Sequence, residues 1–90
     1  MRIYELTPKN GRKSFYRKAY VIIDGKTAYL RSYETIIGSV DPEGNAHRYS
    51  DHHSCTTGAH VKSFLDRTNH DAKAFWELPI ERAPRLTINI

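Results

Sequence analysis

The chain has 90 residues, a formal net charge of +4 and a single cysteine. A chain of this length forms one domain with a small core, because it buries only about 60–65% of its unfolded surface on folding. The lone cysteine excludes a disulfide framework, no stretch approaches the roughly 20 apolar residues of a membrane span, and the first residues lack the apolar run of a secretory signal. We therefore predict a soluble cytoplasmic protein.

The positive charge is concentrated in the first twenty residues. They hold six basic side chains against one acidic side chain, a balance of +5, so that the other seventy residues sum to −1. Aromatic residues are interleaved with these charges, a composition suited to phosphate contacts with base stacking or to an acidic protein surface. The candidate binding residues are Lys9, Arg12, Lys13, Phe15, Tyr16, Arg17, Lys18 and Tyr20. The alternative is a solvated face without a partner.

Alternating apolar residues and turn signals predict strands over about 1–6, 13–23, 27–33, 35–40 and 45–49. Asp24-Gly25 indicates a type I′ hairpin turn, and Asp41-Pro42-Glu43-Gly44 indicates a second turn. Gly38, inside a predicted strand, indicates a bulge or a close approach of another group.

The apolar spacing changes to that of helices after residue 55. A first helix is predicted over about 57–67 with Ser54 or Thr56 as its N-cap, and Asp71 is expected to cap a short second helix that ends near Leu78-Pro79. Polar and apolar residues alternate strictly over 85–90, as in a final edge strand or in an arm that docks on a second copy of the chain. A homodimer is therefore compatible with the sequence.

Together these elements predict an α+β fold. An antiparallel meander of about four to five strands (1–49) would be packed on one face by two helices (50–79), followed by a tail (80–90). The residues expected to form the core are Val21, Ile23, Leu30, Ile36 or Ile37, Val61, Phe64, Leu65, Phe75 and Trp76.

The bend before the first helix is rich in histidine. Asp51-His52-His53 is similar to the start of an HNH-type metal-dependent nuclease site, with Asn69 downstream, but the closing histidine is missing. The zinc candidates are His52, His53, Cys55 and His60. Their spacing matches no CxxC or HxxxH pair, and Cys55 is better suited to a small buried hydrophobe than to a nucleophile. We expect no metal, no cofactor and no catalytic residue.

The start of the first helix is a candidate anion or ligand site formed by Thr56, Thr57, Gly58 and His60, because the free N–H groups of a helix start attract anions. The alternative is an ordinary capping sequence with a half-buried His60 that is hydrogen-bonded to a strand carbonyl or to Thr56.

Four segments carry a resemblance to a known group of proteins: Ser54-x-Thr56-Thr57-Gly58-x-His60-Val61-x-x-Phe64-Leu65, Phe75-Trp76-x-Leu78-Pro79, the opening Tyr4-Glu5-Leu6-Thr7-Pro8-x-Asn10-Gly11-x-Lys13-Ser14-Phe15-Tyr16, and Leu30-x-Ser32-Tyr33-x-Thr35. The chain resembles small uncharacterised proteins from phages and mobile elements of gut-type bacteria. That pattern has Trp and Gly where this chain has Ser50 and His52, so Asp51-His52-His53 is not a feature of the group. The resemblance implies a short accessory gene and no particular activity.

The size, the basic segment and the resemblance favour a non-enzymatic binding protein. The leading hypothesis is a counter-defence inhibitor, comparable to an anti-CRISPR protein, that binds a host protein, a nucleic-acid-containing complex or a signalling ligand. The alternatives are a small basic protein that binds DNA or RNA directly and a nuclease that uses His53.

Overall fold

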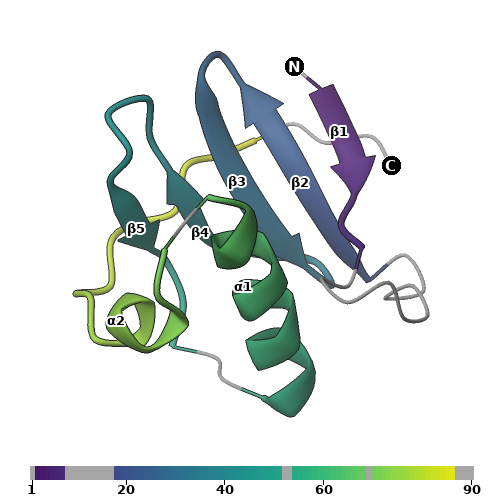
Figure 1. The fold of residues 1–90 in the computed structure, drawn as a ribbon. Helices are drawn as coiled ribbons and strands as arrows, with labels where there is room; N and C mark the ends of the chain where they lie inside the picture. Colours follow the sequence, from purple (N-terminus) through teal and green to yellow (C-terminus); the bar gives the residue numbers. More distant parts are fainter. Residues whose placement is uncertain (1, 8–17, 52–53, 69, 87–90) are drawn as a thin grey trace.

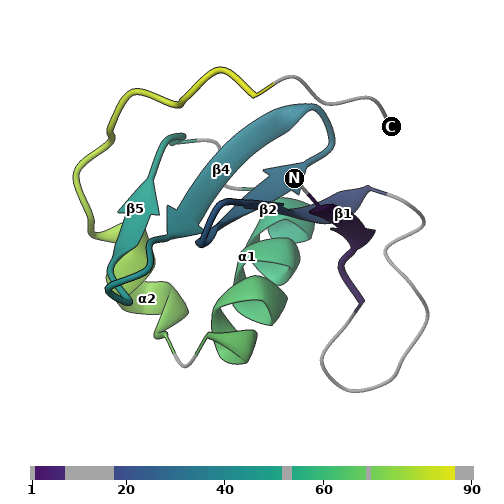
Figure 2. The ribbon, with the colours of Figure 1, turned by 90° about the horizontal axis from the view of Figure 1, so that it is seen from above.

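The protein is described here by a computed structural model that covers residues 2–7, 18–51, 54–68 and 70–86. Its five-stranded antiparallel sheet has the strand order β1-β2-β3-β4-β5. The elements are β1 (Arg2–Glu5), β2 (Ala19–Asp24), β3 (Thr27–Ser32), β4 (Thr35–Val40), β5 (Ala46–Arg48), α1 (Cys55–Arg67) and α2 (Ala72–Trp76). Both helices lie on one face of the sheet (Figures 1 and 2). The predicted α+β meander is confirmed. Within the described residues, no helix has the length and apolar character to cross a bilayer.

The turn between β2 and β3 lies one residue later than predicted. Asp24 pairs with Thr27, so the two central residues are Gly25 and Lys26. Gly25 has φ +65°, and Tyr33 is the only non-glycine with positive φ among the described residues. A type II′ turn has positive φ at the first central residue only, whereas a type I′ turn requires positive φ at both central residues. The observed turn is therefore typical of type II′. The predicted type I′ turn at Asp24-Gly25 is therefore wrong in type and position.

Both expectations for Gly38 are confirmed. Leu30 pairs with Gly38 while Arg31 pairs with Ile36, so Ile37 is an extra residue that forms a bulge in β4. A Cβ atom on Gly38 would lie 2.6 Å from the Phe75 ring and 2.7 Å from the carbonyl oxygen of His47. Glycine at this position therefore lets α2 approach the sheet closely.

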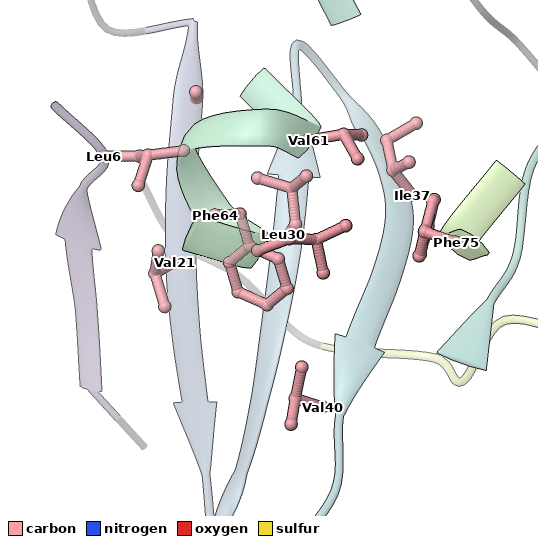
Figure 3. Close-up of a cluster of buried hydrophobic side chains, with 10 residues drawn as sticks. Leu6, Val21, Leu30, Ile37, Val40, Val61, Phe64 and Phe75 are labelled. Atoms are coloured by element: carbon pink, nitrogen blue, oxygen red, sulfur yellow. The ribbon is translucent and has the colours of Figure 1, made fainter. Parts of the chain in front are cut away.

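The core lies between the sheet and the helices (Figure 3). Its buried members are Leu6, Ala19, Val21, Leu30, Ile37, Val40, Val61, Phe64, Leu65 and Phe75. Burial of one such large apolar side chain contributes about 1.5–3 kcal/mol, so this cluster is the main source of stability. Most of the predicted core is confirmed; Ile23 and Trp76 are only partly buried and pack at its margin.

Side-chain caps determine where the helices begin. Ser54 Oγ accepts a hydrogen bond from the backbone N–H of Thr57 at 3.0 Å, so α1 begins at Cys55, two residues earlier than predicted, with Ser54 and not Thr56 as N-cap. Asp71 caps α2 as predicted, and its Oδ1 accepts from the backbone N–H of Lys73 at 3.2 Å.

The chain after α2 returns along the sheet. Ile80 forms an isolated parallel bridge with Arg48, and the backbone N–H of Glu81 donates to the carbonyl oxygen of Arg48 at 2.7 Å. The segment then passes over the sheet face opposite the helices (Figure 2), where Ile22 is fully buried. Residues 85 and 86 are not in a strand, contrary to the predicted edge strand, and 87–90 lie outside the described residues.

Candidate functional site

The basic segment predicted to bind a partner is described only at its end. Lys9, Arg12, Lys13, Phe15, Tyr16 and Arg17 lie outside the described residues. Lys18 and Tyr20 are described, and the fold brings two further side chains to them. Arg31 pairs with Tyr20 across β2 and β3, and the backbone N–H of Tyr33 donates to the carbonyl oxygen of Lys18 at 2.6 Å. We call Lys18, Tyr20, Arg31 and Tyr33 the basic–aromatic surface, which lies at one end of the sheet; Tyr20 and Arg31 are on the face opposite the helices, and the Tyr33 ring contacts His60 of α1.

Tyr33 has an unusual backbone conformation within this surface. It is the first residue of the two-residue loop between β3 and β4, since Ser32 pairs with Thr35, and its φ is 56°. A non-glycine residue in this left-handed region costs about 1–2 kcal/mol. Its side chain is nevertheless 45% exposed, and Lys18 Nζ lies 5.8 Å from the ring centroid, within reach of a cation–π interaction.

Sequence reasoning did not identify Arg31 or Tyr33 as functional residues. The loop at Tyr33-Glu34 lacks the Asn-Gly or Asp-Gly signal of a hairpin turn. Arg31 occupies a position in the polar–apolar alternation of its strand where any solvent-facing residue would fit. The predicted strands 27–33 and 35–40 indicated a tight connection, but they placed Tyr33 inside a strand, whereas β3 ends at Ser32.

A buried polar cluster lies next to Tyr33, on the helix side of the sheet. His60 in α1 is fully buried, and its Nδ1 is 2.7 Å from Ser32 Oγ, which is in turn 3.3 Å from Thr57 Oγ1. The rings of Tyr33 and His60 have centroids 5.9 Å apart. His60 is thus more buried than predicted, and its partner is a strand hydroxyl where a strand carbonyl or Thr56 was expected. Burial lowers the pKa of His60, and the charge of Lys18 lowers it further, so the ring is neutral near pH 7.

The buried His60 makes stability depend on pH in a defined direction. Its pKa is below the ordinary value of about 6.5 in the folded state, so the unfolded chain binds the proton more readily. This contribution to the free energy of unfolding is fully present above about pH 6.5 and is lost as the pH falls toward the folded pKa. We expect urea denaturation between pH 7 and 5 to show a shallower acid-side loss in His60→Gln than in the wild type. Equal slopes would contradict the assignment.

The helix start, predicted as an anion site, is already occupied by the chain itself. The backbone N–H of Thr57 is bonded to Ser54 Oγ and that of Gly58 to Ser54 O at 2.8 Å. The side chains of Thr57 and His60 are buried, Thr56 is exposed and Gly58 is half-buried. Two of the four candidate residues thus belong to the buried cluster, and anion binding here stays a prediction.

Those metal candidates that the structure describes do not lie together. His52 and His53 lie outside them, as does the side chain of Cys55, while Asp51 is exposed and His60 contacts Ser32. Among the residues that the structure describes, no group of three His, Cys, Asp or Glu side chains is placed to hold a metal ion. The nuclease and zinc hypotheses gain no support from this arrangement.

A separate pocket of about 290 Å³ lies between the β4–β5 turn and α2. Its lining is formed by Gly44, Asn45, Ala46, His70, Asp71, Ala74, Phe75 and Leu78. Its principal polar groups maintain the fold, since His70 Nε2 is 2.7 Å from the Gly44 carbonyl and Asp71 caps α2. We therefore place the candidate site at the basic–aromatic surface.

A family model for proteins of unknown function matches residues 4–77 of the chain. The chain belongs to the DUF8033 family. No curated protein and no solved structure matches it. The expected membership of an uncharacterised family is thus confirmed. In this DUF8033 protein the matched range contains the whole basic–aromatic surface and the buried cluster, and it ends before Glu81.

Proposed function

We propose that this DUF8033 protein acts by stoichiometric binding, as an accessory protein of a phage or mobile element, and that the basic–aromatic surface contacts an acidic surface of a host protein. A counter-defence role is the specific form of this proposal. The resemblance in the sequence supports the setting, and the geometry around Tyr33 supports the binding role.

The conformation of Tyr33 is the observation that carries the proposal. A residue in a sparsely populated backbone region persists only where its surroundings enforce it, and such residues gather at ligand and partner sites. Glycine would adopt φ 56° without strain, yet the chain has a large aromatic side chain there, exposed and next to Lys18. Folding alone does not favour this choice, whereas a binding role does.

The chemistry of the surface indicates the kind of partner. Tyr and Arg are enriched in the energetic centres of protein interfaces, because they combine apolar area with a polar group. Lys18 and Arg31 add positive charge, and the basic segment that precedes Lys18 in the sequence adds more. An acidic partner surface with an apolar depression for Tyr33 is complementary to this arrangement.

The test is a variant that separates binding from folding. Tyr33→Gly removes the ring and the strain together, so we expect the free energy of unfolding to stay within about 1 kcal/mol of the wild-type value. Partner capture in affinity purification from the native host should fall at least tenfold, as for the loss of an interface hot spot. Tyr4→Ala is the matched control, because Tyr4 is 42% exposed, close to the 45% of Tyr33, but lies outside the surface.

Purification with and without nuclease treatment distinguishes the two kinds of partner. A protein partner should remain bound after nuclease treatment, in a fixed ratio to the bait. Direct binding of DNA or RNA would instead be lost on nuclease treatment and would weaken steeply with salt, since phosphate contacts release counterions. Equal capture by the wild type, Tyr33→Gly and Tyr4→Ala would contradict the proposed surface.

A further inference from the structure

His47 joins two segments that are distant in the sequence. Its Nε2 is 2.8 Å from Asp41 Oδ2, in the turn between β4 and β5, and its Nδ1 is 2.7 Å from Glu81 Oε2, in the segment after α2. Ionised carboxylates accept hydrogen bonds only, so both ring nitrogens must donate, which requires the protonated imidazolium. A neutral ring has one N–H and can make only one of the two bonds.

We propose that protonated His47 is a pH-dependent clasp that fixes the segment around Glu81 against β5 and loosens it when the ring loses its proton. The segment also has backbone attachments at this point, which are the bridge of Ile80 with Arg48 and the bond from the Glu81 N–H to the carbonyl oxygen of Arg48 at 2.7 Å. Loss of the ring contact therefore removes the side-chain part of the anchor.

Among the described residues that face His47, no further charge cancels this effect. Across the sheet it pairs with Ser39, whose Oγ is bonded to the hydroxyl of Tyr49 at 2.7 Å. Arg48 follows in β5, but its guanidinium is bonded to the carbonyl oxygens of Ser50, Trp76 and Leu78. The facing groups are thus Asp41, Glu81 and the Tyr49 hydroxyl. The hydrogen bonds to Asp41 and then Glu81 raise the pKa of His47, and His47 lowers the pKa of Asp41.

The direction of the pH dependence follows. The clasp is closed while the His47 ring is protonated, and it opens as the pH rises through the raised pKa of His47. Opening therefore loosens the start of the segment that runs over the sheet face opposite the helices (Figure 2).

The test follows His47 and Glu81 in one NMR titration of the full chain from pH 5.5 to 9. In the wild type, the His47 ring and the Glu81 amide should titrate with a common midpoint above the ordinary histidine value of about 6.5. In Glu81→Gln the His47 midpoint should move down, and the amide of residue 81 should stop following it. Glu77→Gln is the matched control, because Glu77 is exposed and precedes the segment.

Three results would overturn the proposal. The first is a Glu81 amide that does not change while His47 titrates, since the segment would then stay docked regardless of the ring charge. The second is an unchanged Glu81 titration in His47→Gln, since another group would then drive it. An unaltered His47 midpoint in Glu81→Gln would equally exclude the clasp.

Discussion

Replacing Gly38 by alanine is expected to lower the free energy of unfolding by about 1–3 kcal/mol, the usual cost of an extra methyl group in a filled core. The new Cβ would lie 2.6 Å from two atoms of the Phe75 ring and 2.7 Å from the His47 carbonyl oxygen. The ring is packed in the core, so it can move only by disturbing that packing or by shifting α2, and the carbonyl belongs to the strand paired with β4. Thermal unfolding should show a fall of about 4–8 °C per kcal/mol for a domain of this size.

A double-mutant cycle identifies the atoms responsible. Phe75→Ala alone should cost about 3–5 kcal/mol, because Phe75 is almost completely buried. In that background Gly38→Ala should cost less than in the wild type, since the ring is gone, but more than zero, since the His47 carbonyl remains. If the cost is the same in both backgrounds, contact with the ring is not what excludes a side chain at this position.

Replacing Arg48 by methionine is expected to destabilise the protein by about 3 kcal/mol. The guanidinium donates to the carbonyl oxygens of Trp76 at 3.0 Å, Leu78 at 2.9 Å and Ser50 at 3.0 Å, and it lies 5.5 Å from the centre of the Trp76 ring. Two of these carbonyls, those of Trp76 and Leu78, lie at and beyond the end of α2, where a positive charge is favourable. Hydrogen bonds to a charged group contribute about 1.5–3 kcal/mol each, and methionine keeps the apolar length of the side chain.

Two further variants test whether the fork geometry of arginine is required. Arg48→Lys should recover only a minor part of the loss, because one ammonium group cannot reproduce the planar set of donors. Arg82→Met, at an exposed position, should change the free energy of unfolding by less than about 0.5 kcal/mol. Urea denaturation measures all three. Full recovery in Arg48→Lys would show that charge alone is sufficient.

The parts of the fold that were predictable depend on local chemistry. Strand alternation located the five strands, and Asp71 marked the start of α2, because period and capping are properties of neighbouring residues. The role of Gly38 was also predictable, since a glycine weakens the interior of a strand and is typical of a bulge or a close approach. The turn at Gly25-Lys26 was misplaced by one residue, because the choice between turn types depends on pairing across the strands.

The parts that were not predictable depend on contacts between distant segments. The link from His47 to Glu81 spans 34 residues and that from Ser32 to His60 spans 28, and neither has a local signal. Lys18 and Tyr20 belong to the predicted binding segment, whereas Arg31 and Tyr33 come next to them only through the sheet register and the loop conformation. The predicted strand at the end of the chain failed at residues 85 and 86, because alternation does not supply a pairing partner.

The strand order has a consequence for how this chain reaches its native state. Each strand pairs with its neighbour in the sequence, and β2 to β5 are joined by connections of two to five residues, so these four strands can assemble hairpin by hairpin without closing a long loop. Domains dominated by such short-range contacts fold faster than those with distant pairings. The contacts that span the molecule, such as the Arg67 guanidinium with Thr7 Oγ1 at 2.6 Å, form between segments 60 residues apart. The docking of α1 against the end of β1 is therefore expected to be a late event, after the central hairpins have formed.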